Sequence, residues 1–333
     1  MNEGKNILLA HGEGGLATKR LIDKIFAPKL MNPILARFED SAILEVGGEK
    51  IAFSTDGFII EPIIFPGGDI GKLAVTGTVN DLAAMAAKPL FFSAAFLIEE
   101  GVEIDKIEKI AESFAVELDR FGAILVAADT KVVPRGHGGE IYISVSGIGE
   151  IKADVHTGRI RPGDELVLSG DIARHSAAII AVREEIETDP PLLSDCASLW
   201  ELVESAIARG VDIHAMRDAT RGGLATILVE IAKSTGYGIT IAQSGIPIAK
   251  QVAVLCDIYG FDPLYLANEG KMVFFVEQGE GKRLVEILSE NPLAKDAAVI
   301  GCVEESGEVI IDTTAGGRRK LIMLEGEQLP RIC

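Results

Sequence analysis

The sequence predicts a two-domain protein of the α/β (α+β) class. Strand-like and helix-like runs alternate along the 333 residues, and each half of the chain contains both kinds. A polar link at 149–158 separates the two series. With 48% hydrophobic residues, the chain also has enough apolar material for two cores. A largely disordered chain is therefore excluded.

In the first half, Gly47-Gly48 between the strand-like runs 42–46 and 50–54 predicts a β-hairpin, because glycine readily adopts the positive φ of such turns. A helical run follows at 72–87, which we expect Pro89 to close. The remaining elements expected here are a buried strand at 90–98, a helix at 105–121, a strand at 123–128 that ends on Asp129, and a strand at 141–147.

The second half mixes the same two kinds of element. We expect strands at 165–169, near Ile239, and at 271–276, 298–303 and 309–312, and helices at 176–183, 198–209, after Arg221-Gly222-Gly223, and at 281–290.

The formal net charge is −18, from 32 Lys and Arg against 50 Asp and Glu. A nucleic-acid surface needs a cationic face to displace counterions from phosphates. The one concentrated basic run is Arg318-Arg319-Lys320, which is too short for that purpose. We therefore expect no nucleic-acid partner.

Neither a membrane span nor a secretory signal is expected. The apolar run at 90–98 has about half of the ~20 residues that cross a bilayer, and the N-terminus is polar. The four cysteines are scattered, without metal-ligand spacing. We expect a cytoplasmic protein without disulfides or structural zinc, in which Cys196, Cys256 and Cys302 are small buried residues.

Five aspartates share one kind of position, at or near the end of an apolar run beside small or hydroxylated residues. Each alone is also typical of a helix cap or a turn. Several converging carboxylates, however, would form the oxygen-rich site that Mg²⁺ prefers. The five are Asp40, Asp56, Asp81, Asp129 and Asp218.

Three glycine-rich segments are candidate anion cradles. Those at 11–15 and 65–72 match neither the Walker nor the Rossmann spacing, and each also fits a simple turn. In the third, 218–224, Gly222-Gly223 opens a predicted helix whose first amides carry partial positive charge.

Taken together, these motifs resemble the HypE family of hydrogenase maturation proteins, within the PurM-like (AIR synthetase-like) ATP-binding superfamily. The resemblance covers nearly the whole chain. The superfamily motifs are TDGF at 55–58, FPGGDIGKLAV at 65–75, GTVNDLA at 77–83, DTKVV at 129–133, DATRGGL at 218–224 and NEGK at 268–271, and the narrower HypE motif is PRIC at 330–333.

The resemblance implies a PurM-like architecture: an N-terminal ATP-binding domain at 1–152 whose sheet forms a homodimer, a C-terminal α+β domain at 153–322, and a tail at 323–333. It implies a carbamoyl dehydratase of [NiFe]-hydrogenase maturation. The partner HypF would place a carbamoyl group on the C-terminal thiol. ATP would drive its dehydration to a thiocyanate, and the cyano group would pass to a HypC-HypD complex as an iron ligand.

Within that activity, the aspartates would hold Mg²⁺ against ATP, and Lys131 would supply positive charge near the transferred phosphoryl group. Thr78 and Asn80 would be hydrogen-bonding neighbours of the nucleotide. Removing protons from nitrogen needs a general base, for which Glu269 is the first candidate and His137 the reserve. Both also fit plainer roles, as a salt-bridged carboxylate and a loop histidine.

Cys333 is the predicted carbamoyl acceptor. A thiol on the last residue is a poor choice for a core, but it suits a group that visits more than one site. The segment 326–333, when extended, spans about 25 Å.

Two segments depart from the family pattern, those that contain Glu39 and His175. Glu39 stands where the superfamily often has aspartate, so Asp40 is the better candidate ligand, and nothing is assigned to His175.

The alternative functions are those of another PurM-like enzyme, such as selenophosphate synthetase, thiamine-monophosphate kinase or AIR synthetase, and of a non-catalytic nucleotide-binding scaffold. The glycine-rich loop at 11–15 lacks the reactive thiol of selenophosphate synthetase.

Overall fold

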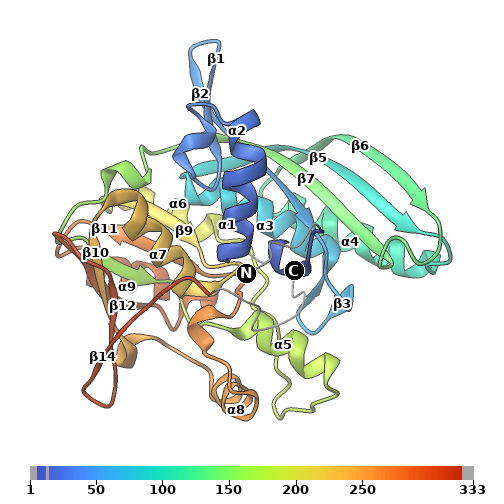
Figure 1. Cartoon of the computed structure of the whole chain (residues 1–333). Helices are drawn as coiled ribbons and strands as arrows, with labels where there is room; N and C mark the ends of the chain where they lie inside the picture. Colours follow the sequence, from blue (N-terminus) through green and yellow to red (C-terminus); the bar gives the residue numbers. More distant parts are fainter. Residues whose placement is uncertain (1–5, 13–14, 325–333) are drawn as a thin grey trace.

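Two β-sheets, one from each half of the chain, form the framework of the described part of the protein (Figure 1). The computed structural model describes residues 6–12 and 15–324. The first sheet has five strands in the order β1-β2-β7-β5-β6, and the second has seven in the order β14-β13-β10-β12-β8-β11-β9. A short ribbon of β3 (Ile64–Phe65) and β4 (Gly68–Asp69) lies outside both sheets.

The five-stranded sheet is antiparallel except for the β5–β6 pair. Gly47 and Gly48, with φ of 64° and 91°, form the turn of the β1–β2 hairpin. β6 lies at the edge of the sheet, and nine of its ten residues are exposed. The strands are β1 (Ala42–Val46), β2 (Glu49–Phe58), β5 (Ala87–Glu99), β6 (Ile124–Val133) and β7 (Ile141–Ile151).

Helix α3 (Ile70–Ala84) packs on one face of this sheet and against α4 (Ile104–Asp119). Asp69 caps α3, since its Oδ1 accepts hydrogen bonds from two backbone amides of the first turn. A Cβ at Gly77 would lie 2.6 Å from the ring of Phe58, so glycine allows α3 to lie directly on β2. The close packing fixes the position of the polar residues in the second half of α3.

The seven-stranded sheet lies in the second half of the chain, and all five residues of its strand β11 are buried. Its strands are β8 (Glu165–Leu168), β9 (Ile213–Asp218), β10 (Gly238–Ala242), β11 (Met272–Val276), β12 (Ala298–Glu304), β13 (Val309–Asp312) and β14 (Arg318–Lys320). The helices of this half are α5 (Arg174–Arg183), α6 (Trp200–Ala208), α7 (Gly223–Thr235), α8 (Lys250–Tyr259) and α9 (Gly281–Ser289).

The N-terminal helix runs without interruption from Leu16 to Leu30, as α1 (Leu16–Leu21), η2 (Ile22–Phe26) and α2 (Ala27–Leu30). Its middle part is a π-helix, in which the Ala27 amide donates to the Ile22 carbonyl. Pro28 follows directly, and because proline lacks an amide hydrogen it disturbs the regular helical ladder there.

Most of the expected elements are confirmed, with shifts of up to four residues at their ends, the largest at the ends of β2 and β7. Two expectations are wrong. Pro89 does not close a helix: α3 already ends at Ala84, and Pro89 lies within β5, where the pairing with β7 shifts register. The strand expected to stop at Asp129 continues to Val133, because Thr130, Val132 and Val133 are β-branched residues that favour extended backbone.

No helix among the described residues is both long enough and apolar enough to cross a membrane.

Candidate active site

Three carboxylates from distant parts of the chain meet between the two sheets. Asp40 precedes β1, Asp81 lies on α3 and Asp218 ends β9. One oxygen of each lies within 4.8 Å of the others. We call these three residues the carboxylate cluster. It unites three of the five aspartates predicted as metal ligands.

Burial is the main reason why these carboxyl groups hold their protons more tightly than usual. It raises the pKa of Asp40 to about 6, partly offset by Arg217, and the pKa of Asp218 to about 8, with the charge of Asp40 adding to the rise. The pKa of Asp81 is also raised well above its ordinary value, by burial and then by Asp218, Asp40 and Asp56. The three carboxyl groups lie close together, and the positive charge near them is too small to balance three carboxylates.

Asp40 shows the imbalance most directly. Its Oδ1 lies 3.0 Å from Arg217 Nε, whereas its Oδ2 is buried and has no hydrogen-bond partner among the described residues. A buried carboxylate oxygen without a donor is costly unless a ligand satisfies it. The cluster therefore has an oxygen available for a cation.

Strand β2 adds two residues to the site. Ser54 Oγ donates a hydrogen bond to Asp81 Oδ2, and the charge of Asp56 contributes to the raised pKa of Asp81 and Asp218. Ser54 and Asp56 are two positions apart in the strand and so point to the same face, toward α3. Asp56 is therefore the fourth predicted ligand that lies near the cluster.

The fifth, Asp129, lies elsewhere in the chain, together with Lys131. In the pairing of β6 with β5, Asp129 lies beside Ala95 and Lys131 beside Leu97. Ala128 lies beside the buried Ala94. Alternation along the strand puts Asp129 and Lys131 on the sheet face opposite to Asp56. They form an exposed ion pair, with Lys131 Nζ 2.7 Å from Asp129 Oδ2.

Asn80 and Glu269 meet where α3 touches the second half of the chain. Asn80 Oδ1 accepts from the Leu199 amide at 2.9 Å, and its Nδ2 donates to the carbonyls of Ala197 and Glu269. Glu269 is buried, three residues before the start of β11. Thr78 is buried too, and its hydroxyl donates to the Ala74 carbonyl one turn earlier in α3. Thr78 and Asn80 lie just before Asp81 on α3, but the Asn80 side chain is engaged by backbone groups of the second half of the chain, and the predicted roles of these three residues stay predictions.

The glycine-rich segments differ in what they offer an anion. In the segment 65–72, the amides of Gly71 and Lys72 already donate to Asp69. In the segment 218–224, Gly222 and Gly223 have φ of 75° and 62° and open α7 after the loop 219–221 that follows Asp218. The Gly223 amide donates to the Thr220 carbonyl, and the role of this segment as an anion cradle stays a prediction. In the segment 11–15, residues 13–14 lie outside the described residues.

His137 and the cysteines complete the predicted set. His137 is exposed in the loop between β6 and β7, where its Nδ1 lies 3.2 Å from the Arg135 carbonyl oxygen. Cys333 lies outside the described residues. Cys196 and Cys256 are buried as expected, while Cys302 is half-buried, and burial raises the pKa of Cys256 to about 11. None of these three pairs in a disulfide.

Sequence reasoning missed Ser54 and Arg217. The signal for Ser54 was its two-residue spacing from Asp56 in a strand. Arg217 directly precedes Asp218 in β9. Its Nη1 donates a hydrogen bond to the Phe38 carbonyl, so it also holds the segment that carries Asp40. Glu39, the doubtful ligand, accepts a hydrogen bond from the Thr157 amide at 2.9 Å instead.

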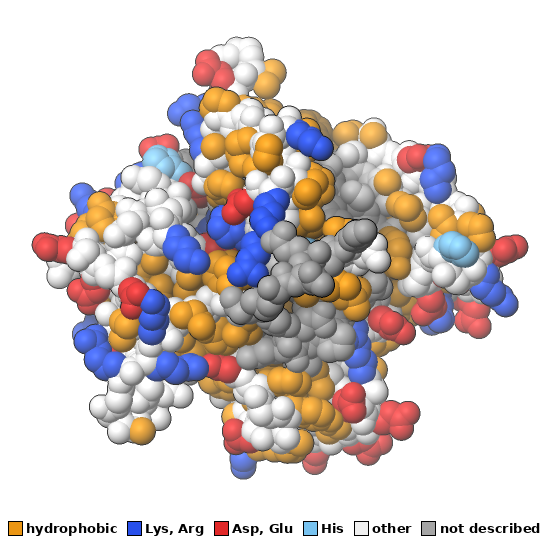
Figure 2. All heavy atoms as spheres, in the orientation of Figure 1, with side chains coloured by type: hydrophobic (Ala, Val, Ile, Leu, Met, Phe, Trp, Pro, Cys, Tyr) orange, Lys and Arg blue, Asp and Glu red, His pale blue; other side chains and the backbone are white. Residues whose placement is uncertain are grey.

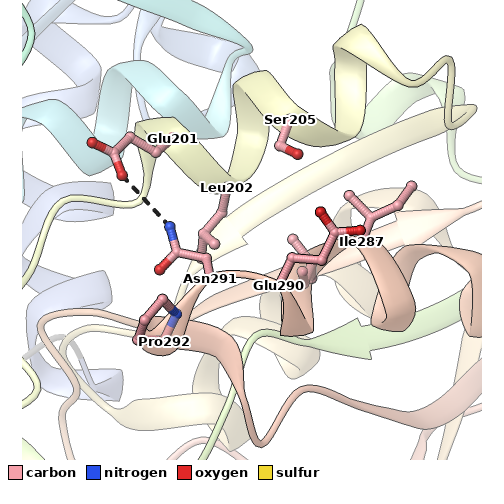
Figure 3. Close-up of a pocket in the computed structure, with 8 residues that line it drawn as sticks. Glu201, Leu202, Ser205, Ile287, Glu290, Asn291 and Pro292 are labelled. Atoms are coloured by element: carbon pink, nitrogen blue, oxygen red, sulfur yellow. Dashed lines mark hydrogen bonds between the residues drawn. The ribbon is translucent and has the colours of Figure 1, made fainter.

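A surface hollow between α6 and α9 lies apart from all of these residues (Figure 3). Asn291 donates to Glu201 across it, and Glu290 is paired with Arg209. Because its acids are engaged and none of the predicted residues lines it, we do not assign the chemistry to this hollow.

Comparison with known proteins gives the class first. Residues 38–151 match the N-terminal domain of AIR synthase related proteins, and residues 161–313 match the C-terminal domain. A crystal structure of thiamine monophosphate kinase from Aquifex aeolicus, 20% identical over 89% of this chain and 97% of that chain with a TM-score of 0.68, shares the fold. The fold and the carboxylate cluster thus define a two-domain protein of the AIR synthase related class.

The particular family follows from nearer relatives. The chain is 42% identical to carbamoyl dehydratase HypE of Rhodobacter capsulatus, over 99% of this chain and 98% of that protein. It is 40% identical to carbamoyl dehydratase HypE of Escherichia coli, over 98% of this chain and 99% of that protein. A crystal structure of a HypE-HypF complex matches with a TM-score of 0.87 and 42% identity over 91% and 99% of the two chains. A crystal structure of HypE in complex with ATP matches with a TM-score of 0.83 and 40% identity, over 98% of this chain and 100% of that chain. The chain belongs to the HypE family of carbamoyl dehydratases.

Proposed function

We propose that the chain dehydrates a carbamoyl group on the Cys333 thiol to a thiocyanate, at the expense of ATP, and so supplies a cyanide ligand for the iron of [NiFe]-hydrogenase. The observation that carries the proposal is the carboxylate cluster with its unsatisfied Asp40 oxygen. It occurs in a chain that matches carbamoyl dehydratases over nearly its full length.

The reaction converts S–C(=O)–NH₂ and ATP into S–C≡N, ADP and phosphate. The carbonyl oxygen attacks the γ-phosphorus, the bond to ADP breaks, and the nitrogen gives up one proton. The second N–H proton then leaves, the C–O bond breaks, and the oxygen departs with the phosphate. Phosphorylation thus turns a poor leaving group into a good one, and the protein must position and neutralise the phosphates.

The cluster fits a magnesium ion, because all its ligand atoms are carboxylate oxygens and one buried oxygen lacks a donor. Asp40, Asp81 and Asp218 would hold the ion, with Asp56 beside them. When bound, Mg²⁺ would neutralise charge on the phosphates of ATP. Ser54 and Arg217 keep Asp81 and Asp40 in place by their direct contacts.

Asp129 and Lys131 face away from this cluster, so we propose that they act across a homodimer interface. β6 is an edge strand with exposed apolar side chains, including Val126 at 61% and Val132 at 69% exposed. An exposed apolar edge strand favours pairing with another chain. A second copy that pairs along this edge would then bring its own Lys131 into the interface.

We assign Glu269 as the base that removes protons from the carbamoyl nitrogen, with His137 as the reserve. Glu269 is supported by its burial and by the contact of its backbone with Asn80, next to Asp81. His137 lies in the exposed loop that follows the edge strand β6, and so it would act from that end of the strand.

One of the proposed partners is supported by a relative. A related protein forms a HypE-HypF complex, and we propose that HypF delivers the carbamoyl group here. We further propose that a HypC-HypD complex accepts the cyano group. The unpaired Cys196, Cys256 and Cys302 suit the cytoplasm, which we propose as the compartment.

The rival is a scaffold that binds ATP only to regulate docking. ATP hydrolysis by the carbamoylated protein distinguishes the two. The dehydratase predicts one ADP per chain in a burst that requires carbamoyl-Cys333 and disappears in Cys333→Ala. Hydrolysis that continues unchanged in Cys333→Ala would favour the scaffold.

A further inference from the structure

A buried group of charged side chains lies beside Glu269. Figure 2 shows Lys, Arg, Asp and Glu side chains on the outer surface of the protein, but Lys271, Asp171 and Asp195 are buried, with side chains that are 7%, 8% and 2% exposed. Lys271 Nζ lies 3.5 Å from Asp171 Oδ1 and 4.0 Å from Asp195 Oδ2. The nearer partner of Lys271 is therefore Asp171.

Asp195 makes a closer contact with the backbone of Glu269. Its Oδ1 accepts a hydrogen bond from the Glu269 amide at 3.2 Å, whereas its Oδ2 is buried and has no hydrogen-bond partner among the described residues. An unsatisfied buried oxygen costs free energy, and a buried ion pair often adds no more stability than apolar side chains would. Asp195 also lies too far before α6, which starts at Trp200, to cap it. Stability and capping thus leave this carboxyl group unexplained, and its contact with Glu269 remains.

The segment that carries Asp195 is fixed to helix α3. We call residues 194–199 the linking segment. Asn80 Oδ1 accepts from the Leu199 amide at 2.9 Å, and Asn80 Nδ2 donates to the Ala197 carbonyl at 3.1 Å. Asn80 directly precedes Asp81 of the carboxylate cluster, so the linking segment is held next to the helix residue that carries part of that cluster.

Two more contacts tie the linking segment to the first half of the chain. The Thr76 hydroxyl, one turn before Asn80 on α3, lies 3.2 Å from Cys196 Sγ. The Ser194 amide donates to the Pro66 carbonyl at 2.8 Å. The linking segment is therefore held at both of its ends and between them.

The same segment holds the backbone of Glu269 from two sides. Asp195 Oδ1 accepts from the Glu269 amide, and the Ala197 amide donates to the Glu269 carbonyl at 3.3 Å. A Cβ at Gly270 would lie 1.9 Å from the Asp195 carbonyl oxygen, so glycine is needed where the two backbones touch. The linking segment thus fixes where the backbone of Glu269 lies relative to α3.

We propose that Asp195 is a positioning residue for the dehydration: its Oδ1 holds the Glu269 amide and so keeps Glu269 in place relative to the carboxylate cluster. This role rests on the proposed function, in which Glu269 removes protons from the carbamoyl nitrogen. A base must lie within about 3 Å of the atom whose proton it removes. A displacement of about 1 Å can lower the rate about a hundredfold. Asp195 acts through Glu269 and not on the substrate.

Two uncharged variants of similar shape separate the hydrogen bond from the charge. Asp195→Asn keeps an oxygen that accepts from the Glu269 amide, whereas Asp195→Leu has none. In the full chain, carbamoylated by HypF and saturated with Mg-ATP, mass spectrometry follows the loss of water from the Cys333 peptide over one turnover. Asp195→Leu should be at least about tenfold slower than Asp195→Asn. Both should bind Mg-ATP as tightly as the unmodified chain, because the defect lies in the chemical step.

Asp171→Asn and Asp171→Leu are the matched control pair. Asp171 is the other buried carboxyl partner of Lys271, and it also pairs with Arg174. These two variants should dehydrate the peptide at equal rates. Equal rates for Asp195→Asn and Asp195→Leu would overturn the proposal. A difference at position 171 as large as that at position 195 would also overturn it, because the defect would then come from Lys271.

Amide hydrogen exchange tests the contact without ATP or carbamoylation. Asp195→Ala also lacks the acceptor and adds no volume, so it takes the place of Asp195→Leu if that variant does not fold. The Glu269 amide should exchange at least about tenfold faster in Asp195→Ala than in Asp195→Asn. Equal exchange would contradict the hydrogen bond on which the proposal depends.

The two proposals fail in different ways. An unmodified chain that keeps its carbamoyl group in the presence of Mg-ATP contradicts the proposed function, and the role of Asp195 falls with it. An unmodified chain that loses water, in which Asp195→Asn and Asp195→Leu are equally fast, contradicts the role of Asp195 alone.

Discussion

Arg217 Nε lies 3.0 Å from Asp40 Oδ1, and both side chains are nearly buried. This ion pair places the nearest permanent positive charge beside three carboxylates that otherwise repel one another. Arg217 balances the charge of Asp40 but leaves Asp40 Oδ2 without a hydrogen-bond partner among the described residues. The site is therefore held together in the absence of a metal but is not neutral.

Removing that arginine should unfold the protein more easily. Arg217→Met leaves Asp40 buried without its counter-charge, which should cost about 3 kcal/mol in the free energy of unfolding, measured by urea denaturation. Arg283→Met, which removes an exposed ion pair with Glu280, is the control and should cost less than about 1 kcal/mol. Equal losses would show that Arg217 does not balance the cluster.

The stability of the metal-free protein should fall as pH rises. The pKa of Asp218 is raised to about 8 and that of Asp40 to about 6, so the folded state holds these protons more tightly than the unfolded state. That contribution is complete below the ordinary value of 3.8 and is lost as pH approaches 8. Because Mg²⁺ binds the deprotonated cluster, its stabilising effect should grow between pH 6 and 9.

Thermal melts with and without Mg²⁺ measure this effect. In Asp218→Asn both the pH dependence and the gain from Mg²⁺ should shrink, whereas the exposed Asp119→Asn should behave as the unmodified chain. A magnesium gain that is constant from pH 6 to 9 is incompatible with the cluster as the metal site.

Asp81→Asn should separate stability from binding. Without metal, asparagine needs no extra proton to be buried beside Asp40, Asp56 and Asp218, so the fold should gain about 1 kcal/mol, which raises the melting midpoint by roughly 1–2 °C for a chain of this length. Affinity for Mg-ATP should fall at least tenfold, about 1.4 kcal/mol, by calorimetry. If Asp81→Asn bound Mg-ATP as tightly as before, the nucleotide site would lie elsewhere.

The edge strand β6 should form the dimer. Val126→Glu puts a charge into the proposed interface and should shift the protein to a monomer in light scattering, with loss of ATP-dependent turnover. Val116→Glu, on the exposed side of α4, should leave the oligomeric state unchanged. A dimer that survives Val126→Glu would require a different interface and another role for Lys131.

Local signals predicted much of this structure. The Gly47-Gly48 turn, the helix opened by Gly222-Gly223 and the buried run of β11 are each encoded within a few residues, and all are confirmed. Four of the five aspartates converge because Asp56, Asp81 and Asp218 lie on β2, α3 and β9, while Arg217 holds Asp40 just before β1.

Strand pairing and long-range contacts were harder to foresee. Asp129 was expected at a strand end, but β6 continues past it, and alternation then turns its side chain to the other face of the sheet. Arg217 contacts Asp40 across 177 positions in sequence, a distance that no local pattern encodes. The domain limits and the catalytic roles of Glu269, His137 and Cys333 stay predictions.

The mass of the Cys333 peptide tests the account most directly. After carbamoylation by HypF, incubation with Mg-ATP should make that peptide lighter by one water, with formation of ADP, and a non-hydrolysable ATP analogue should leave its mass unchanged. Asp81→Asn should retain the carbamoyl group. If ATP were hydrolysed while the carbamoylated peptide kept its mass, the dehydratase account would be wrong.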